Sequence, residues 1–448
     1  MRSFRESIGG LRVAVIGAGK SGVASARLLK KLGAEVFLSE AKWISPNLRE
    51  ELKMLGVRFE EGGHSDRILN SDLIVPCPGV PLTNPWITRA RAIGIPVMGE
   101  LELGYRFLSS PIVAVTGTNG KSTVVSWIAH IMRKSGAIAC GNIGHPLTSL
   151  SGSKDPLVVE VSSFQLETII DFKPGVALIL NLDQDHFDRH GTFEAYRKAK
   201  ARIFENQEEE DHLILNYDDP HLRGLEKDAR SRVHYFSIER AVKGAYVEGE
   251  WIVLEEDEKL KLMPTKSLAL FGVHNLQNAL ASALASYLMG TPLEEIREGL
   301  GSFRGLPHRL EYVGEINGVR FINDSKGTNP HAVLWALKSI DEPVILIMGG
   351  EDKGLDFTPL REIVKKKVKK LILVGESRNK LKAVFEGTVE LSEAGNLEDA
   401  VELAFSEAER GDAVLLSPGC SSFDMFKNYK ERGERFKDAV RRLGRHQI

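Results

Sequence analysis

Features that many proteins rely on are scarce or absent in this sequence. Only three cysteines occur in 448 residues, at Cys77, Cys140 and Cys420, and none forms a C-x-x-C pair. Their scarcity excludes a disulfide framework and a cysteine-rich zinc site, and it is typical of a protein in a reducing compartment. No apolar run approaches the ~20 residues needed to cross a bilayer, which excludes a membrane-spanning helix.

An excess of charge of one sign is also absent. The 59 Lys and Arg residues against 61 Asp and Glu residues give a formal net charge of −2. A broad polyanion-binding surface is therefore not expected, and nucleic acid is excluded as the main partner. The first ten residues carry charges but no apolar core, so we expect no signal peptide. Together these features predict a cytoplasmic protein that binds neither membrane nor nucleic acid.

The length and the apolar runs predict a multidomain α/β protein. Domains usually hold about 100–200 residues, so a chain of this length should have two to four of them. Short β-branched runs alternate with helix-like stretches in three series, which indicates parallel sheets built from βαβ units. The strands are expected at residues 11–17, 34–38, 72–75, 112–115, 157–161, 176–180, 319–322, 344–347, 371–374 and 414–416. The predicted domains are residues 1–99, 100–305 and 306–448.

A loop with two glycines, a lysine and several hydroxyl residues opens the second series. It reads TGTNGKST at residues 116–123, directly after a strand and directly before a helix. That order binds nucleotide phosphates: backbone N–H groups face the anion, Lys121 neutralises β- and γ-oxygens, and Ser122 or Thr123 contacts Mg²⁺. The common pattern has glycine where this chain has Val115, which indicates a specific subgroup. The alternative is a tight strand–helix turn with a chance lysine.

Three polar residues downstream are candidates for metal chemistry. Glu160 lies in the apolar strand at 157–161, where a carboxylate is costly unless it meets an ion such as Mg²⁺. His186 follows the strand at 176–180, at the edge where parallel sheets bind ligands. Lys200 lies on a predicted helix. Each has a plain alternative: a glutamate facing water, a histidine hydrogen-bonded within the fold, and a solvated lysine.

Several strings along the chain form an ordered set. They are TGTNGKST, EVSSFQ (160–165), DHFDRHG (185–191) with YRKAKARIFEN, HNLQNA (274–279), LPHRLE (306–311) and NDSKGTNP (323–330). The set closely resembles the Mur ligases of peptidoglycan synthesis over nearly the whole chain. NDSKGTNP, and SPGCSSFDMFKNYKERGERF at 417–436, resemble the members that add D-glutamate. The resemblance implies a Rossmann-like first domain, a central P-loop ATPase-type sheet and a Rossmann-like third domain.

The resemblance also implies a reaction and its cofactors. The enzyme would join D-glutamate to UDP-N-acetylmuramoyl-L-alanine through an acyl phosphate and a tetrahedral intermediate, with ATP and two Mg²⁺ ions, acting as a monomer. Ser122, Glu160 and His186 would hold the metals, and Lys200 would carry a CO₂-derived carbamate as a further oxygen ligand. The YRxAKxRI register favours Lys200 over Lys198. The implied catalytic residues are Lys121, Glu160, His186 and Lys200.

By the same resemblance, two groups of residues bind ATP and the incoming amino acid. The ATP group is Gly117, Thr118, Asn119, Gly120, Lys121, Ser122, Thr123, Asn275, Asn278, Arg309, Asp324 and Lys326. The amino-acid group is Thr328, Lys353, Ser422, Phe423 and Tyr429. Asn142 would contact the reacting end of the other substrate. Tyr429 stands where the family more often has Phe, and Asn275, Asn278 and Ser422 have the alternative role of capping a helix.

The first series carries a second glycine motif. GAGKSG at residues 17–22 fits G-x-G-x-x-G, with Glu40 at the distance expected for a ribose contact. The motif alone would indicate an NAD-binding dehydrogenase. A UDP-sugar presents the same diphosphate, and the family resemblance implies that substrate here. Candidate contacts are Lys20, Ser21, Ser39, Glu40 and Gly79, with Ser39 at a position where relatives often have an acidic residue.

Three other functions remain open from the sequence. A sibling ligase that adds a different amino acid, or a folylpolyglutamate-type synthase, would use the same ATP site. A dinucleotide-dependent dehydrogenase would explain only the first ~100 residues. A catalytically silent nucleotide-binding module would keep Lys121 but would not need Glu160, His186 and Lys200 together.

Overall fold

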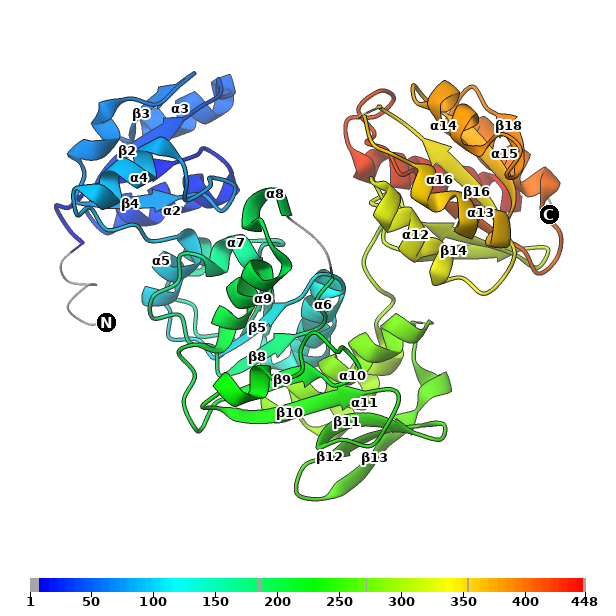
Figure 1. Cartoon of the computed structure of the whole chain (residues 1–448), viewed down its shortest axis with the longest axis horizontal. Coiled ribbons are helices and arrows are strands. Elements are labelled where there is room, and N and C mark those ends of the chain that lie inside the picture. Colours follow the sequence, from blue (N-terminus) through cyan, green and yellow to red (C-terminus); the bar gives the residue numbers. More distant parts are fainter. Residues whose placement is uncertain (1–7, 184–186, 271, 353, 446–448) are drawn as a thin grey trace. The chain divides into compact units, whose positions relative to one another are not determined.

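Three sheets of four, nine and six strands make up the framework of the chain (Figure 1). The computed structural model describes residues 8–183, 187–270, 272–352 and 354–445. Contacts divide the chain into two compact units, Met1–Leu268 with Leu276–Phe303, and Ala269–Asn275 with Arg304–Ile448. The first two sheets lie in the first unit and the third sheet in the second unit, which confirms the α/β class. Among the described residues, no helix is both long and apolar enough to cross a membrane.

The first sheet is parallel throughout, in the order β3-β2-β1-β4. Alternate residues of β1 enter two different cores: Val13 and Val15 pack on the side of α2, and Ala14 and Ile16 pack on the side of α4. Both faces of the sheet are therefore covered, as parallel sheets require. The elements are β1 Arg12–Ile16, α2 Lys20–Lys31, β2 Glu35–Glu40, α3 Pro46–Met54, β3 Arg58–Glu61, β4 Leu73–Pro76 and α4 Pro85–Ala92.

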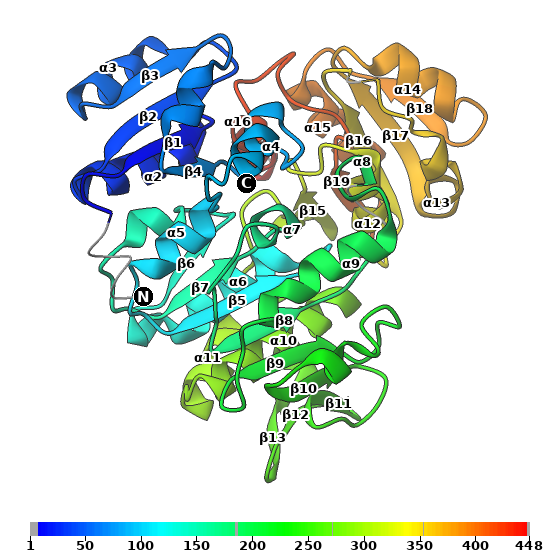
Figure 2. The same ribbon diagram turned by 60° about the vertical axis from the view of Figure 1, so that its left-hand side comes forward.

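The second sheet has the order β13-β12-β11-β10-β9-β8-β5-β7-β6, with β5 between β7 and β8 (Figure 2). Its strands are β5 Ile112–Thr116, β6 Ile138–Gly141, β7 Leu157–Glu160, β8 Val176–Ile179, β9 His212–Asn216, β10 Arg232–Ser237, β11 Gly244–Glu248, β12 Trp251–Glu255 and β13 Lys259–Pro264. The sequence analysis expected only β5, β7 and β8 of this sheet and missed the other six strands. The pairs from β6 to β11 are parallel, as expected for the class, whereas β12 and β13 are added antiparallel. Their links, residues 249–250 and 256–258, are too short for a crossover helix, so hairpins form instead.

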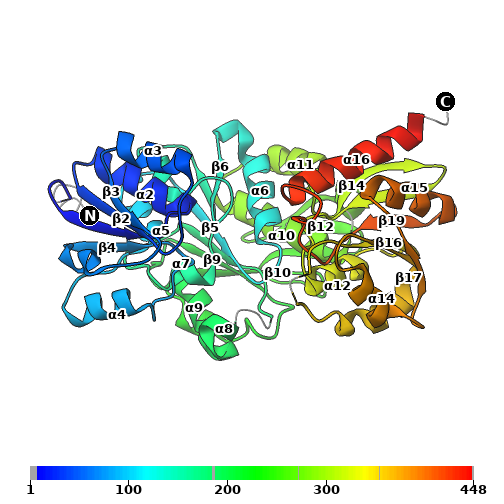
Figure 3. The same ribbon diagram turned by 90° about the horizontal axis from the view of Figure 1, so that it is seen from above.

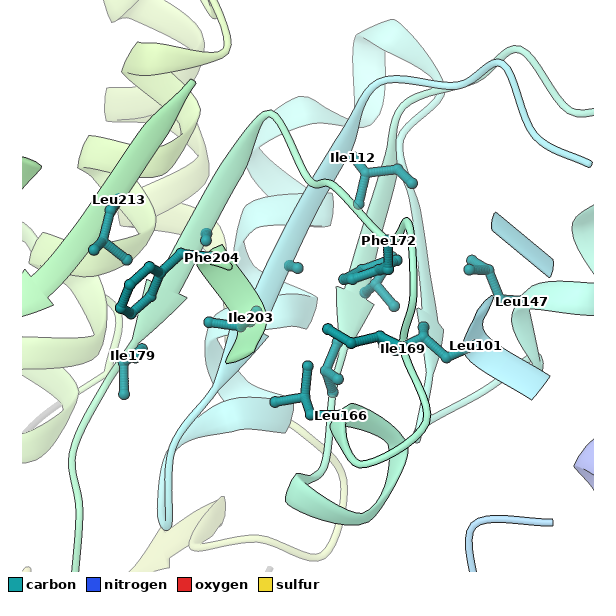
Figure 4. Packing of buried hydrophobic residues seen from close by; sticks show 14 of the residues in the cluster. Leu101, Ile112, Leu147, Leu166, Ile169, Phe172, Ile179, Ile203, Phe204 and Leu213 are labelled. Carbon is teal, nitrogen blue, oxygen red and sulfur yellow. The ribbon is translucent and has the colours of Figure 1, made fainter. Parts of the chain in front are cut away.

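Helices and a large apolar core cover this second sheet. In Figure 4, Ile112 and Ile179 from the strands face Phe172, Ile203 and Phe204 from the segments packed on them. Each of these side chains is buried. The helices of this region are α6 Lys121–Ile131, α7 Ser163–Leu166, α8 Phe187–His190, α9 Phe193–Ala201, α10 Val273–Leu288 and α11 Leu293–Ser302.

A short helix, α5 (Glu100–Arg106), follows the first sheet and is fastened by a buried carboxylate. Glu102 is fully buried and accepts hydrogen bonds from the backbone N–H groups of residues 170–172 at 2.9–3.1 Å. Arg106, one turn later, pairs with the same carboxylate at 2.8 Å. Because both oxygens have partners, Glu102 is accounted for as a structural anchor.

The third sheet has the order β14-β15-β19-β16-β17-β18 and is parallel except for β14. Asn317 and Gly318 join β14 to β15 with φ of 53° and 78°, the Asn-Gly turn that suits a two-residue hairpin. Helix α16 runs beside β14 and α15 (Figure 3). The elements are β14 Glu311–Ile316, β15 Val319–Asn323, α12 Pro330–Lys338, β16 Val344–Gly349, α13 Arg361–Lys367, β17 Val368–Val374, α14 Arg378–Phe385, β18 Glu390–Glu393, α15 Leu397–Glu407, β19 Ala413–Leu416 and α16 Tyr429–Arg445.

Candidate active site

The phosphate loop connects β5 to α6, and no side chain in the described part of the chain caps the start of that helix. Gly117 and Gly120 have φ of 147° and 83°, values that favour glycine. Gly120 is the N-cap residue, and no side chain caps α6, so its first N–H groups can serve a phosphate. A Cβ on Gly120 would lie 2.6 Å from Oδ1 of Asn278, so this predicted ATP residue lies against the loop. Asn275 lies one turn earlier on α10.

Two residues that the sequence analysis did not single out brace the loop. Asn181, just after β8, accepts the Asn119 N–H at 2.8 Å and donates to its carbonyl at 3.2 Å. The Thr118 hydroxyl lies 3.0 Å from the Tyr196 hydroxyl and accepts the Asp183 N–H at 3.0 Å. The side chains of Asn181 and Tyr196 thus hold the loop in place. Asn181 could have been predicted from its position directly after a parallel strand, where ligand-binding residues gather.

The two predicted active-site lysines meet at the phosphate loop. Lys121 donates to the Gly117 and Thr118 carbonyls, at 2.8 Å each. Lys200 is buried, donates to the Gly117 carbonyl at 2.8 Å and lies 3.3 Å from the Thr116 hydroxyl. Its ammonium also lies 4.8 Å from the centre of the Tyr196 ring. The position of Lys200 excludes the alternative of a solvated lysine.

Glu160 lies at the same edge of the sheet. The register pairs it with Val115 of β5 and with Gly141 of β6. The side chain is 2% exposed, which excludes a glutamate facing water. Oε1 accepts a hydrogen bond from Nδ2 of Asn142 at 2.8 Å, while Oε2 is buried with no hydrogen-bond partner among the described residues. A buried carboxylate oxygen in this state suits a hard cation.

Ser122 and Thr123 lie in the first turn of α6, with Ser122 buried. His186 and Lys353, predicted as a metal ligand and an amino-acid contact, lie outside the described residues. Within the described part of the chain, no three His, Cys, Asp or Glu side chains gather as a metal site. A metal ion bound here would therefore need Glu160, a hydroxyl group and further ligands that are not His, Cys, Asp or Glu side chains of the described residues.

The three glycines of the GAGKSG loop in the first sheet have different physical roles. Gly17 has a φ of 101°, and a Cβ on Gly22 would lie 2.0 Å from the Gly17 carbonyl oxygen. Gly19 has an ordinary φ of −69° and no atom within 4 Å of an added Cβ, so neither backbone nor packing requires glycine there. The space beside Gly19 is open to a ligand that approaches the backbone closely. Lys20 and Ser21 begin α2 at this point.

The two candidates on β2 already have partners within the chain. The Glu40 carboxylate accepts the Ala18 N–H at 2.6 Å and the Lys42 N–H at 3.0 Å. Ser39 is fully buried, and its hydroxyl lies 2.6 Å from both Glu60 Oε1 and His64 Nδ1. Glu40 therefore shapes the glycine loop itself. Gly79 lies exposed after β4, at the same edge of the sheet.

In the second unit, Asp324 follows β15 and is buried. Its carboxylate accepts the Ser417 hydroxyl at 2.8 Å and the Leu310 N–H at 3.3 Å. Burial raises the pKa of Asp324 to about 7, against the opposing effect of these bonds and of Arg309. Arg309 therefore lies close enough to Asp324 to act on its pKa. Lys326 lies two residues on, with its ammonium 5.6 Å from the centre of the Tyr429 ring.

A buried arginine that the sequence analysis missed joins the two loops of this unit. Arg432 is 1% exposed and donates to the Ser325 hydroxyl and carbonyl, and to the Cys420 and Ser421 carbonyls, at 2.9–3.1 Å. Burial lowers the pKa of Arg432 to about 10. It ties the NDSKGTNP loop, with Thr328, to the SPGCSS loop, with Ser422. The only signal for it was its place within the string at 417–436.

The remaining amino-acid candidates lie around these loops. Ser422 is buried, Phe423 is 65% exposed, and Thr328 and Tyr429 are half-buried. The Tyr429 carbonyl accepts the Ser325 hydroxyl at 2.7 Å, which brings the start of α16 to the NDSKGTNP loop. The second unit therefore gathers the described members of this group around one pair of loops.

Comparisons with known proteins identify related families along most of the chain. Three family models match: the MurD N-terminal domain at residues 12–84, the Mur ligase middle domain at 115–286, and the Mur ligase glutamate ligase domain at 308–420. The UDP-N-acetylmuramoylalanine–D-glutamate ligase of Caldanaerobacter subterraneus subsp. tengcongensis is 42% identical over 97% of this chain and 99% of its own. That of Pelotomaculum thermopropionicum is 46% identical over 96% and 97%.

Solved structures show the same fold at low identity. The UDP-N-acetylmuramate-alanine ligase of Thermotoga maritima has a TM-score of 0.59 at 19% identity, covering 97% of this chain and 100% of that one. The MurF ligase of Thermotoga maritima has a TM-score of 0.58 at 16% identity, covering 99% and 97%.

We predict that the fold tolerates alanine at Gly19 but not at Gly22. Gly22→Ala should lower the melting temperature by several degrees, because its Cβ would collide with the Gly17 carbonyl. Gly19→Ala should leave the melting temperature within about 2 °C of the unchanged protein. It should weaken binding of UDP, used as a diphosphate probe, about tenfold or more, since the methyl group fills the open space beside the backbone. Calorimetric titration with UDP measures this. Unchanged UDP affinity in Gly19→Ala would contradict it.

A second prediction follows from the raised pKa of Asp324, about 7 in the folded protein. Unfolded aspartate titrates near about 3.9, so between these values the folded state holds a proton that the unfolded chain has lost. The contribution of Asp324 to the free energy of unfolding therefore falls as pH rises from about 4 to about 7. Asp324→Asn should remove this fall. The free energy of unfolding, measured in urea, should therefore rise in the variant relative to the unchanged protein as pH increases from about 4 to about 7. A difference in that free energy that does not depend on pH would contradict a raised pKa at Asp324.

Proposed function

This chain belongs to the Mur ligase family, and we propose that it joins D-glutamate to UDP-N-acetylmuramoyl-L-alanine while ATP is converted to ADP and phosphate. The observation that carries the choice of substrates is the similarity, over almost the full length, to ligases named for that reaction. The geometry supports the reaction class, because the phosphate loop, Glu160 and Lys200 meet at one edge of the second sheet.

We assign one substrate to each predicted domain. Residues 1–99 would hold the UDP group at the GAGKSG loop, residues 100–305 would hold ATP, and residues 306–448 would hold D-glutamate. The open space at Gly19 supports the first assignment, and the uncapped start of α6 supports the second. For the third, Arg432 ties together the two loops that carry Thr328 and Ser422, two of the predicted amino-acid contacts.

The reaction begins when the alanyl carboxylate attacks the γ-phosphorus of ATP and ADP leaves. The resulting acyl phosphate has a leaving group that the carboxylate lacked. The D-glutamate amine then attacks the acyl carbon, loses a proton and expels phosphate from the tetrahedral intermediate. Lys121, now bonded to two loop carbonyls, would turn to the β- and γ-oxygens when ATP binds. Asn142 would hold Glu160 in place through its 2.8 Å hydrogen bond.

Mg²⁺ fits this edge of the sheet because the buried Oε2 of Glu160 has no partner among the described residues. Ser122, Glu160, His186 and a carbamate on Lys200 would hold two ions. Bound there, Mg²⁺ supplies charge neutralisation for the phosphoryl group in transfer. Addition of CO₂ to the neutral Lys200 amine, with loss of a proton, would turn a buried cation into an anionic oxygen ligand.

Several finer points stay predictions from the sequence. They are the ATP contacts of Asn275, Arg309, Asp324 and Lys326, the cytoplasmic location and the monomeric state.

The proposed function predicts phosphate release that needs ATP, Mg²⁺, UDP-N-acetylmuramoyl-L-alanine and an amino acid together, fastest with D-glutamate. Lys121→Ala should lower kcat by about 10²–10³-fold, because the transferring phosphoryl group loses a charged partner. Lys198→Ala, an exposed lysine on α9, is the matched control and should retain the unchanged rate. Faster release with another amino acid would support a ligase but contradict its specificity for D-glutamate. Absence of release with every amino acid would reject the function.

The carbamate makes a separate prediction. Removal of CO₂ from the assay should lower the rate, and bicarbonate should restore it, because the carbamate forms reversibly. Protein incubated with ¹³C-bicarbonate should show a carbamate carbonyl signal by NMR. That signal should be lost in Lys200→Met and kept in Lys198→Ala. If the rate does not depend on CO₂ and no such signal appears, the carbamate on Lys200 is rejected, whereas the proposed ligase function is not.

A further inference from the structure

Helix α5 carries two buried glutamates, two residues apart, whose surroundings differ. Glu102 accepts three backbone N–H groups and pairs with Arg106. Glu100 is equally buried, yet its two oxygens are used unevenly. Oε1 accepts both the Thr148 N–H at 2.7 Å and the Thr148 hydroxyl at 2.8 Å, while Oε2 has no hydrogen-bond partner among the described residues. Contacts within the fold satisfy both carboxylate oxygens of Glu102 but only one carboxyl oxygen of Glu100.

Glu100 lines a narrow pocket inside the first unit. The pocket is walled by the segment after β4, with Val80 and Leu82, and by α7, with Phe164. The cation in its lining, Arg189, is already paired with Glu167 and also donates to the Val80 carbonyl at 3.4 Å. The pocket lining therefore combines apolar side chains with the acidic residue Glu100.

The position of the pocket relates it to both substrate loops of the unit. One wall, from Pro76 to Leu82, follows β4 at the edge of the first sheet that carries the GAGKSG loop. The other wall, α7, begins three residues after Glu160 at the edge of the second sheet that carries the phosphate loop. A substrate held by its diphosphate at the first loop and reacting at the second has its middle portion between these walls.

The hydrogen bonds of Glu100 have the pattern of a neutral carboxylic acid. A carboxylate has two equal acceptor oxygens, whereas a protonated carboxyl has one carbonyl oxygen that accepts and one hydroxyl that donates. In Glu100 the Thr148 N–H and the Thr148 hydroxyl both meet Oε1, and Oε2 has no hydrogen-bond partner within the described part of the chain. Burial also raises the pKa of Glu100, although the Thr148 and Leu147 N–H groups act in the opposite direction. A proton on Oε2 would leave one donor at the pocket.

We propose that Glu100 is a protonated substrate-binding residue whose Oε2 hydroxyl donates a hydrogen bond to an amide carbonyl of the acylated muramoyl-alanyl portion of the UDP substrate. The proposal rests on the function proposed above. Each amide of that portion carries a methyl group close to its carbonyl, and the apolar walls at Val80 and Leu82 suit such groups. Thr148 orients the carboxyl group, so that its donor is fixed before the substrate arrives.

The test compares two substitutions at Glu100 in the full-length enzyme. Glutamine can accept from Thr148 and still donate to the pocket, so Glu100→Gln should keep the KM for UDP-N-acetylmuramoyl-L-alanine within about threefold. Glu100→Met has a similar shape without the donor, and should raise that KM about tenfold, since a substrate carbonyl is left unpaired. The KM values for ATP and D-glutamate should stay unchanged in both. Glu102→Gln is the control: it should lower the melting temperature and leave every KM unchanged.

Two outcomes would overturn the proposal while the ligase assignment stands. An unchanged KM in Glu100→Met would show that Oε2 serves no substrate, and equal increases in both variants would show a carboxylate that accepts. Inactivity of the unchanged enzyme with these substrates would instead reject the proposed function itself. If Glu100→Met does not fold, infrared difference spectra decide: a protonated carboxyl band that shifts when the UDP substrate binds, and is absent in Glu100→Gln, supports the proposal, and lack of that band rejects it.

Discussion

The parallel pairing of β5 with β7 and β8 is the constraint on which the candidate active site depends. In that register Glu160 lies beside Val115, the last residue but one of β5, and Asn181 follows β8 at the same edge. Parallel strands all end at one edge of a sheet, so whatever follows them is brought together. The phosphate loop therefore meets Glu160 on one side and its Asn181 brace on the other. A shift by one residue would turn Glu160 to the opposite face.

Sequence reasoning located ten strands, most of them short apolar runs. It missed strands at sheet edges, such as β3, β14 and β18, and also strands inside the second sheet, such as β9 and β10. Buried strands such as β5 and β16 read as continuous apolar runs, whereas β3, β14 and β18 keep polar residues because one side is solvated. In the site, the loop lysine and Glu160 could be read from motif and context. The partners of Ser39, Glu40 and Arg432 could not, because hydrogen bonds across 20 or more residues depend on the folded chain.

Buried charge distinguishes structural residues from those available for chemistry. Glu102 and Arg432 have lost their water, but hydrogen bonds from the protein replace it, and both fix the loops around them. Glu160 and Glu100 each keep one buried oxygen that no described residue satisfies. Such an atom lowers stability unless a ligand completes it. The two half-satisfied carboxyl groups lie in the same unit, one beside the phosphate loop and the other in the pocket beside α7.

The glycine loop of the first sheet differs from a dinucleotide-binding loop in the use of its acidic residue. A dinucleotide-binding loop uses the acidic residue after its second strand to contact a ribose hydroxyl. Here Glu40, at that position, accepts the N–H groups of Ala18 and Lys42, so its carboxylate supports the glycine loop. What the loop retains for a ligand is the open backbone at Gly19 and the start of α2. Those two features recognise a diphosphate whatever it is attached to. The choice between a nicotinamide and a sugar therefore falls to groups beyond the diphosphate.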